Sequence, residues 1–292
     1  GPWEWDVKRL GASLAVAGRN NGFADAERRE VITASVGDYR TAMREFASMG
    51  NLDVWYSRLQ VREGLPQLQA LLSKKGLKEA ERLVEKARTK DSIQAFDKLT
   101  HDVNGEPRIV RDPPLIVPIE ELLTADQAAT FLERYHELLR TYRRSLLGDR
   151  RHLLEDFRFV HMAHKVVGVG SVGTRAWIIL MLGRDNTDPL FLQAKEAQDS
   201  VLAPFVGKSH FANQGQRVVE GQRLMQAASD IFLGWERAEG LSGGKRDFYL
   251  RQLHDWKGSW PPEAMDPRTM SVYGTMCART LARAHARSGD RI

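Results

Sequence analysis

Three glycines near the middle of the chain, Gly168, Gly170 and Gly173, have the G-x-G-x-x-G spacing of loops that bind phosphate groups. Glycine has no Cβ atom, so the backbone amides of such a loop can approach phosphate oxygens closely. Ser171 within the loop and Thr174 directly after it are further candidate phosphate contacts. The spacing alone is a weak signal, because three glycines also suit an ordinary tight hairpin.

The residues after the glycines decide between two kinds of nucleotide site. In a dinucleotide-binding unit a helix must follow, because its N-terminus holds the pyrophosphate. Here residues 176–182 form an apolar run rich in β-branched and aromatic side chains, closed by a polar turn at 183–188, which is typical of a strand. A third strand follows and ends on Lys195. This succession is the layout of a kinase nucleotide lobe, where the lysine pairs with the phosphates.

A kinase-type lobe also needs a glutamate that holds the lysine, carried on a helix inserted between the third and fourth strands. Glu220 lies on the helix predicted there, over residues 213–228, so we predict Lys195 and Glu220 as the catalytic pair. Glu196 is adjacent to the lysine but is expected to point to the opposite face of the sheet. An edge lysine and a solvated helical glutamate are the ordinary alternatives for this pair.

The last strand of such a lobe leads to a hinge that meets the nucleotide base. The segment 248–253 is the strand candidate in that position. Its final residues, Arg251, Gln252 and Leu253, are therefore the hinge candidates, and Gln252 and Leu253 are predicted to contact the base. Backbone groups would make these contacts, so the side chains there say little about the ligand.

Other catalytic chemistries are not supported by the sequence. No H-E-x-x-H motif or Cys/His cluster is present, so no metal site is predicted from the residues. His161 and His164 are three residues apart on a strand-like segment and should face opposite sides. The lone cysteine, Cys277, lies among apolar helical residues and is expected to fill the core.

Composition narrows the class of protein. The chain has 292 residues, 42% of them hydrophobic, and a net charge of +5, which suits an anionic ligand such as a nucleotide. Nucleic-acid binding is not predicted, because the densest basic stretch, 140–151, lies partly on a predicted helix and suits a solvated face. No membrane span is expected, and the single cysteine fits a reducing, cytoplasmic location.

The surrounding pattern predicts an α+β fold of the kinase type. We expect a small antiparallel five-stranded sheet with one inserted helix, packed on a larger, mainly helical lobe. Residues 1–150 should form the helical lobe, 151–256 the sheet-containing region, and 257–292 a returning helix of the helical lobe. The fourth and fifth strands are predicted at 231–235 and 248–253, separated by a charged loop over 236–246.

Several long segments closely resemble the bacterial family called domain of unknown function 2252. The resemblance covers essentially the whole chain. The segments are GPWEWDVKRL at 1–10, VGVGSVGTR at 167–175, FLQAKEA at 191–197, GQRVVEGQRLMQAASDIFLGW at 215–235, FYLRQLHDWKGS at 248–259 and LARAHARSGD at 281–290. The family is similar to the protein kinases and aminoglycoside phosphotransferases, with the order of its parts circularly permuted.

The resemblance implies a phosphotransferase that uses ATP and magnesium and acts on an unknown small-molecule acceptor. Its two catalytic and metal-binding motifs, G-D-x-H-x-x-N and D-F-D-E, would lie before Gly1, so this chain is expected to bind nucleotide without turnover. The missing motifs should leave a groove between the lobes, flanked by the start of the first helix at Trp3 and the end of the last near Asp290. Two alternatives stay open: a non-catalytic, pseudokinase-like nucleotide-binding module, and a basic interaction protein.

Overall fold

The computed structural model describes residues 1–58, 72–89, 92–166, 173–239, 243–253 and 260–292. The chain divides into two compact units. Unit 1 comprises residues 1–87, 223–228 and 258–292, and unit 2 comprises residues 88–222 and 229–257. The segment 1–150, expected as one helical lobe, is thus divided between the two units. The coarser prediction of a mixed α+β protein with antiparallel sheets is confirmed.

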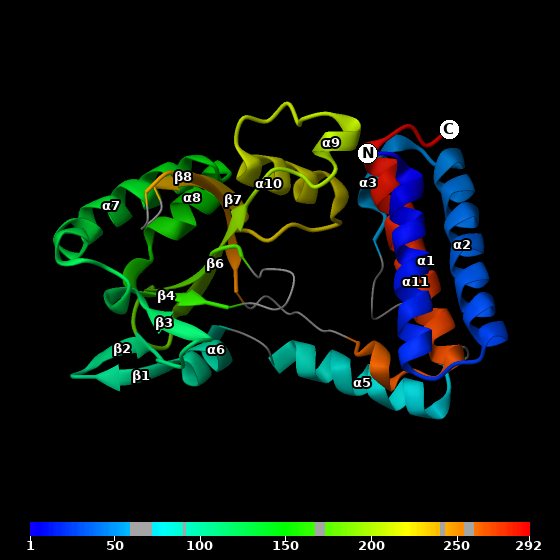
Figure 1. Cartoon of the computed structure of the whole chain (residues 1–292), viewed down its shortest axis with the longest axis horizontal. Coiled ribbons are helices and arrows are strands. Elements are labelled where there is room, and N and C mark those ends of the chain that lie inside the picture. Colours follow the sequence, from blue (N-terminus) through cyan, green and yellow to red (C-terminus); the bar gives the residue numbers. More distant parts are fainter. Residues whose placement is uncertain (59–71, 90–91, 167–172, 240–242, 254–259) are drawn as a thin grey trace. The chain divides into compact units, whose positions relative to one another are not determined.

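Unit 1 is helical. Three long helices with apolar faces lie side by side and supply most of its core (Figure 1). These are α1 (Trp3–Asn20), α2 (Asp25–Ser48) and α11 (Pro267–Ser288). The shorter α3 (Asn51–Tyr56) and α5 (Lys74–Thr89), with a 3₁₀ turn at Pro262–Ala264, complete the helices described in or next to this unit. Ala278 and Ala282 of α11 are fully buried against α2, because small side chains let two helices approach closely.

The first helix and the last helix of the chain are in contact within unit 1. The Tyr39 hydroxyl lies 2.8 Å from Nδ1 of His285, and Nε2 of the same ring lies 3.3 Å from the Asp6 carboxylate. Trp3 stacks on the Tyr39 ring at a centroid distance of 5.9 Å. The first turns of α1 and the last turns of α11 are therefore held together by polar and aromatic contacts.

Unit 2 is built on a six-stranded antiparallel sheet, so the predicted number of five is wrong. The order is β3-β4-β5-β6-β8-β7. The strands are β3 (Ile116–Pro118), β4 (Arg158–Lys165), β5 (Ala176–Leu182), β6 (Pro189–Ala197), β7 (Gly234–Glu239) and β8 (Lys245–Gln252). The additional strand, β3, has three residues and ends on a proline, which leaves no alternation to read.

The limits of the last two strands also differ from the prediction. Both extend into the segment 236–246, which the sequence suggests is a charged loop. Its charges are paired across the sheet: Arg237 lies 2.5 Å from Asp247, and Arg246 lies 3.0 Å from Glu196. Ion pairs between neighbouring strands let charged side chains occupy strand positions that look like loop in the sequence.

Helices and a hairpin cover the two faces of the sheet. One face packs against α7 (Ala125–Arg144) and α8 (Gly148–Glu155), and the other against α6 (Ser92–Leu99) and the hairpin of β1 (Thr100–Val103) and β2 (Glu106–Ile109). Figure 1 shows α7 and α8 together on one side of the sheet. Between β6 and β7 come α9 (Ala203–Val206) and α10 (Gln214–Met225). Across the described residues, none of the helices combines the length and apolarity needed to cross a bilayer.

Candidate functional site

The glycine turn connects two neighbouring antiparallel strands, β4 and β5. Gly168, Gly170 and Ser171 lie outside the described residues. Gly173 follows them with a φ of +83°, a left-handed conformation that favours glycine, and Thr174 is half-buried just before β5. A strand, not a helix, follows the glycines. This confirms the prediction from the apolar run and rules out the dinucleotide-binding arrangement.

Lys195 lies on the next strand, β6, directly opposite Ala176 at the start of β5. Side chains alternate along a strand, so Gln193 points to the same face as Lys195. In the register of β6 with β8, Tyr249 is opposite Lys195, and Arg251 is opposite Gln193. Directly opposed residues share a face. These four residues therefore form two polar rows on one side of the sheet, which we call the lysine face.

The helix α10 begins on the lysine face. Its first residue, Gln214, donates its backbone N–H to the Asp247 carboxylate at 2.7 Å, and Arg237 contacts both oxygens of the same group. Burial raises the pKa of Asp247, but the Arg237 guanidinium and the amide outweigh it and hold the pKa below its usual value. A Cβ added to Gly215 would lie 2.1 Å from the Phe248 carbonyl oxygen, so glycine allows α10 to approach the β8 backbone.

Glu220, the predicted partner of Lys195, lies on α10, five residues after Gly215. Both Lys195 and Glu220 are half-buried, and both belong to unit 2. The anchored start of α10 places this helix on the face to which the lysine points. The ion pair between the two side chains stays a prediction.

Glu196 points to the opposite face, as predicted, and is a buried charged group whose role sequence reasoning missed. Its side chain is 4% exposed and pairs with Arg175 at 3.3 Å and Arg246 at 3.0 Å. It also accepts the Arg175 backbone N–H at 3.1 Å. Burial raises the pKa of Glu196, but these donors outweigh it and lower the pKa. The Glu196 carboxylate on β6 thus binds both Arg175, directly before β5, and Arg246 on β8.

One polar side chain on the lysine face has a buried atom without a partner among the described residues. Gln193 is 5% exposed, and its amide is not one of the described buried groups that lack a hydrogen-bond partner. Arg251 forms no ion pair with a described residue, and its buried Nε has no hydrogen-bond acceptor there. Burial raises the pKa of the adjacent Tyr249, and the positive charge of Arg251 acts against that rise. Buried polar groups are normally satisfied, so the Nε of Arg251 is a candidate contact for a water or a ligand.

The backbone amides of the predicted hinge residues already have partners. The N–H of Gln252 donates to Asp230 at 2.8 Å, and the other oxygen of that carboxylate accepts the Phe232 N–H at 2.9 Å. The N–H of Leu253 donates to the Phe191 carbonyl at 2.9 Å. A base accepting from either amide would have to displace a protein group. Residues 254–259, which continue the predicted hinge, lie outside the described residues.

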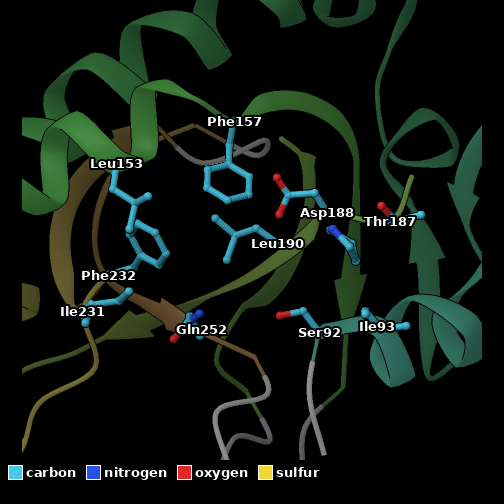
Figure 2. Close-up of a pocket in the computed structure, with 11 residues that line it drawn as sticks. Ser92, Ile93, Leu153, Phe157, Thr187, Asp188, Leu190, Ile231, Phe232 and Gln252 are labelled. Carbon is cyan, nitrogen blue, oxygen red and sulfur yellow. The ribbon is translucent and has the colours of Figure 1, made fainter. Parts of the chain in front are cut away.

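A pocket of about 370 Å³ lies at the other end of β6. Figure 2 shows Leu153, Phe157, Leu190 and Phe232 around a common apolar space, with the Asp188 carboxylate to one side. Gln252 also lines this pocket. Leu190 is five residues from Lys195, or about 17 Å along an extended strand, so the pocket is separate from the lysine face.

The remaining candidate residues are occupied by structural contacts. In the basic segment 140–151, Arg143 pairs with Glu155, and Arg151 donates to carbonyls at the end of α7. His161 is buried with its Nε2 3.0 Å from the Glu120 carboxylate, while His164 contacts Trp177. No group of three or more His, Cys, Asp or Glu side chains that could hold a metal ion occurs in the described part of the chain.

Comparison with known proteins assigns the family. A model described as "Uncharacterized protein conserved in bacteria (DUF2252)" matches residues 1–292. The chain belongs to the DUF2252 family. This confirms the membership expected from the six sequence segments. No curated protein and no solved structure matches the chain. DUF2252 membership names no activity, so function has to be inferred from the lysine face and the elements around it.

Proposed function

We propose that the sheet of unit 2 is a kinase-type nucleotide-binding lobe, and that this DUF2252 protein is a nucleoside-triphosphate-dependent phosphotransferase acting on a small molecule. One observation carries the proposal. Lys195 lies on the strand next to the glycine hairpin β4–β5, and α10, inserted between β6 and β7, starts on the face to which Lys195 points. Kinase nucleotide lobes have the same parts in the same order.

Each part has a physical role in phosphate binding. The Lys195 ammonium would neutralise phosphate as a compact charge, and Glu220 would hold it in position. Gly173 and the glycines before it would let backbone amides approach the phosphate oxygens. Arg251 fits this reading, because a guanidinium whose buried Nε has no acceptor among the described residues suits an anionic, acceptor-rich ligand.

Two ligands implied by family resemblance differ in how well the described residues fit them. A nucleotide fits the lysine face. For magnesium we assign no ligand, since no described group of side chains suits a metal ion. When bound, magnesium would neutralise charge on the transferred phosphate. The small-molecule acceptor is not identified by any described contact.

Binding of a fluorescent nucleotide tests the proposal. Lys195→Met should weaken binding about tenfold or more, because a charge-assisted hydrogen bond contributes roughly 1.5–3 kcal/mol. The matched control is Lys245→Met, an exposed lysine on β8, which should bind as the wild type does. Equal affinity of wild type and Lys195→Met would refute the nucleotide site.

A non-catalytic nucleotide-binding module is the second candidate, and it predicts the same binding result. The two candidates differ in turnover. Release of nucleoside diphosphate, measured with cell metabolites as acceptors, would support the enzyme. Binding that depends on Lys195 would support the module if a protein that also carries the two catalytic motifs implied by the family resemblance gave no release. The third alternative, a basic interaction protein, is not favoured, since Arg143 and Arg151 have internal partners.

A further inference from the structure

We propose that the pocket at the Leu190 end of β6 binds a small organic cation, a primary amine carried on an aromatic or branched aliphatic group. All the residues that line this pocket belong to unit 2. Leu190 lies about 17 Å along the strand from Lys195, so the inference is independent of the proposed nucleotide site. Amine binding and nucleotide binding can therefore be tested separately, and either can fail alone.

The walls of the pocket are apolar and held by the core. Seven of the 11 lining residues are apolar, and two of them, Leu190 and Phe232, are core residues that are each 2% exposed. Phe157 packs edge-on against Phe232, with the ring centroids 6.3 Å apart. The volume of about 370 Å³ is within the range of pockets that bind small molecules. The pocket can therefore hold one apolar group of modest size.

One carboxylate gives the pocket its charge. Asp188 is the only ionisable residue in the lining, and it forms no ion pair with any residue that the structure describes. Arg184, in the same turn, pairs with Asp185 at 2.9 Å instead. Figure 2 shows the Asp188 carboxylate beside Phe157 and Leu190, at the edge of the apolar space. A single carboxylate next to apolar walls favours a ligand with one positive charge on an apolar body.

The hairpin turn between β5 and β6 holds this carboxylate in place. Oδ2 of Asp188 accepts the Arg184 N–H at 3.2 Å, and the Gly183 N–H donates to the Asp188 carbonyl at 2.9 Å. A Cβ added to Gly183 would clash with Oδ2 and lie 3.3 Å from the Phe157 ring, so glycine lets the carboxylate and the ring meet at the turn. One backbone donor uses only part of a carboxylate with about four lone-pair sites. An ammonium bound there would add a charge-assisted hydrogen bond close to an aromatic ring.

Uncharged polar side chains complete the lining and favour a primary amine. Ser92, Thr187 and Gln252 line the pocket, and the side chain of each can accept a hydrogen bond. A primary ammonium has three N–H donors, so it can bind Asp188 and still use such acceptors. A tertiary amine has one donor, and a carboxylate ligand would be repelled by Asp188.

Titration of the full chain with phenethylamine and with isoamylamine, followed by NMR, tests the inference. The matched ligands are the two corresponding alcohols, which keep the apolar body without the charge, and phenylacetate, which carries the opposite charge. At least one amine should bind about tenfold more tightly than its alcohol, the effect expected of one charge-assisted hydrogen bond at a partly open site. Phenylacetate should bind more weakly than either.

Three variants assign the binding to this pocket. Asp188→Asn should lower the affinity for the amine to that of the alcohol, because asparagine keeps an oxygen for the Arg184 N–H but not the charge. Asp156→Asn is the matched control, an exposed aspartate beside Phe157 in the sequence that does not line the pocket, and should bind the amine as the wild type does. Leu153→Trp, at the exposed rim on α8, fills the space and should weaken amine and alcohol together.

The results that would overturn the inference are distinct from those that bear on the nucleotide site. Equal affinity for amine and alcohol, unchanged amine affinity in Asp188→Asn, or no saturable binding of either amine would each overturn it. None of these outcomes depends on Lys195. Thermal unfolding of each variant checks that the fold is intact. If Asp188→Asn unfolds, the comparison of amine with alcohol in the wild type and in Leu153→Trp still decides.

Discussion

Replacing Glu196 by glutamine should destabilise the sheet of unit 2 measurably. The substitution keeps the shape of the side chain but leaves Arg175 and Arg246 without their shared negative charge. Removing one partner of a fully buried ion pair costs about 3–5 kcal/mol. The two arginine side chains are 32% and 30% exposed and can be rehydrated in part, so we expect about 2 kcal/mol. For a unit of this size that lowers the melting temperature by roughly 4–8 °C.

Urea unfolding followed by hydrogen exchange of β5, β6 and β8 peptides would measure this loss separately from the helical unit. Glu239→Gln, an exposed glutamate on β7, is the matched control. The pKa of Glu196 is lowered in the fold, so its contribution should be present at pH 7 and disappear as the pH falls through that lowered value. A difference below about 0.5 kcal/mol at pH 7, within the usual range of surface substitutions, would refute the buried-charge argument.

Three further predictions follow from the described contacts. Gly215→Ala should cost about 1–3 kcal/mol and speed hydrogen exchange in α10, because its Cβ would strike the β8 backbone; Gly148→Ala, where nothing lies within 4 Å, should not. Burial raises the pKa of Glu236 to about 7, so the folded state holds a proton there that the unfolded state releases above about pH 4.3. The free energy of unfolding of Glu236→Gln, relative to that of the wild type, should therefore rise by about 2 kcal/mol between pH 5 and pH 8 in urea titrations. A difference that stays constant with pH would contradict this. Burial lowers the pKa of His161, whose Nδ1 accepts a backbone N–H at 3.0 Å, so only the neutral ring fits. Stability should fall as the pH drops below about 6.5, and His161→Gln should remove that slope in urea midpoints at pH 7.5 and 5.

Local patterns were sufficient to predict the elements around the lysine face. The glycine spacing and the apolar run 176–182 gave the hairpin, and side-chain alternation placed Lys195 and Glu196 on opposite faces. The neighbours across β6 and β8 could not be predicted in the same way. Gln193 meets Arg251 only through a register between segments almost sixty residues apart, and no local pattern specifies a pairing of that range.

Some elements were missed for a different reason. The strand Ile116–Pro118 is too short to show alternation. The ends of β7 and β8 carry charges whose partners lie on other strands, so they look like loop until the pairs are known. Arg175 and Arg246 likewise read as surface residues in the sequence. Each of these errors comes from an interaction between segments distant in the chain.

The sheet order also determines when this site can assemble during synthesis. Strands β4, β5 and β6 follow one another and can pair as soon as each emerges. The partner of β6 on its other side is β8, which is made about 50 residues later. Closing so long a loop costs about 2 kcal/mol more than closing a hairpin, because loop entropy grows with the logarithm of length. Until β8 docks, β6 presents an unpaired edge, and such edges favour association with other chains. The nascent protein is therefore most prone to aggregate after residue 197 and before residue 252 leaves the ribosome, and the lysine face is complete only when that interval has passed.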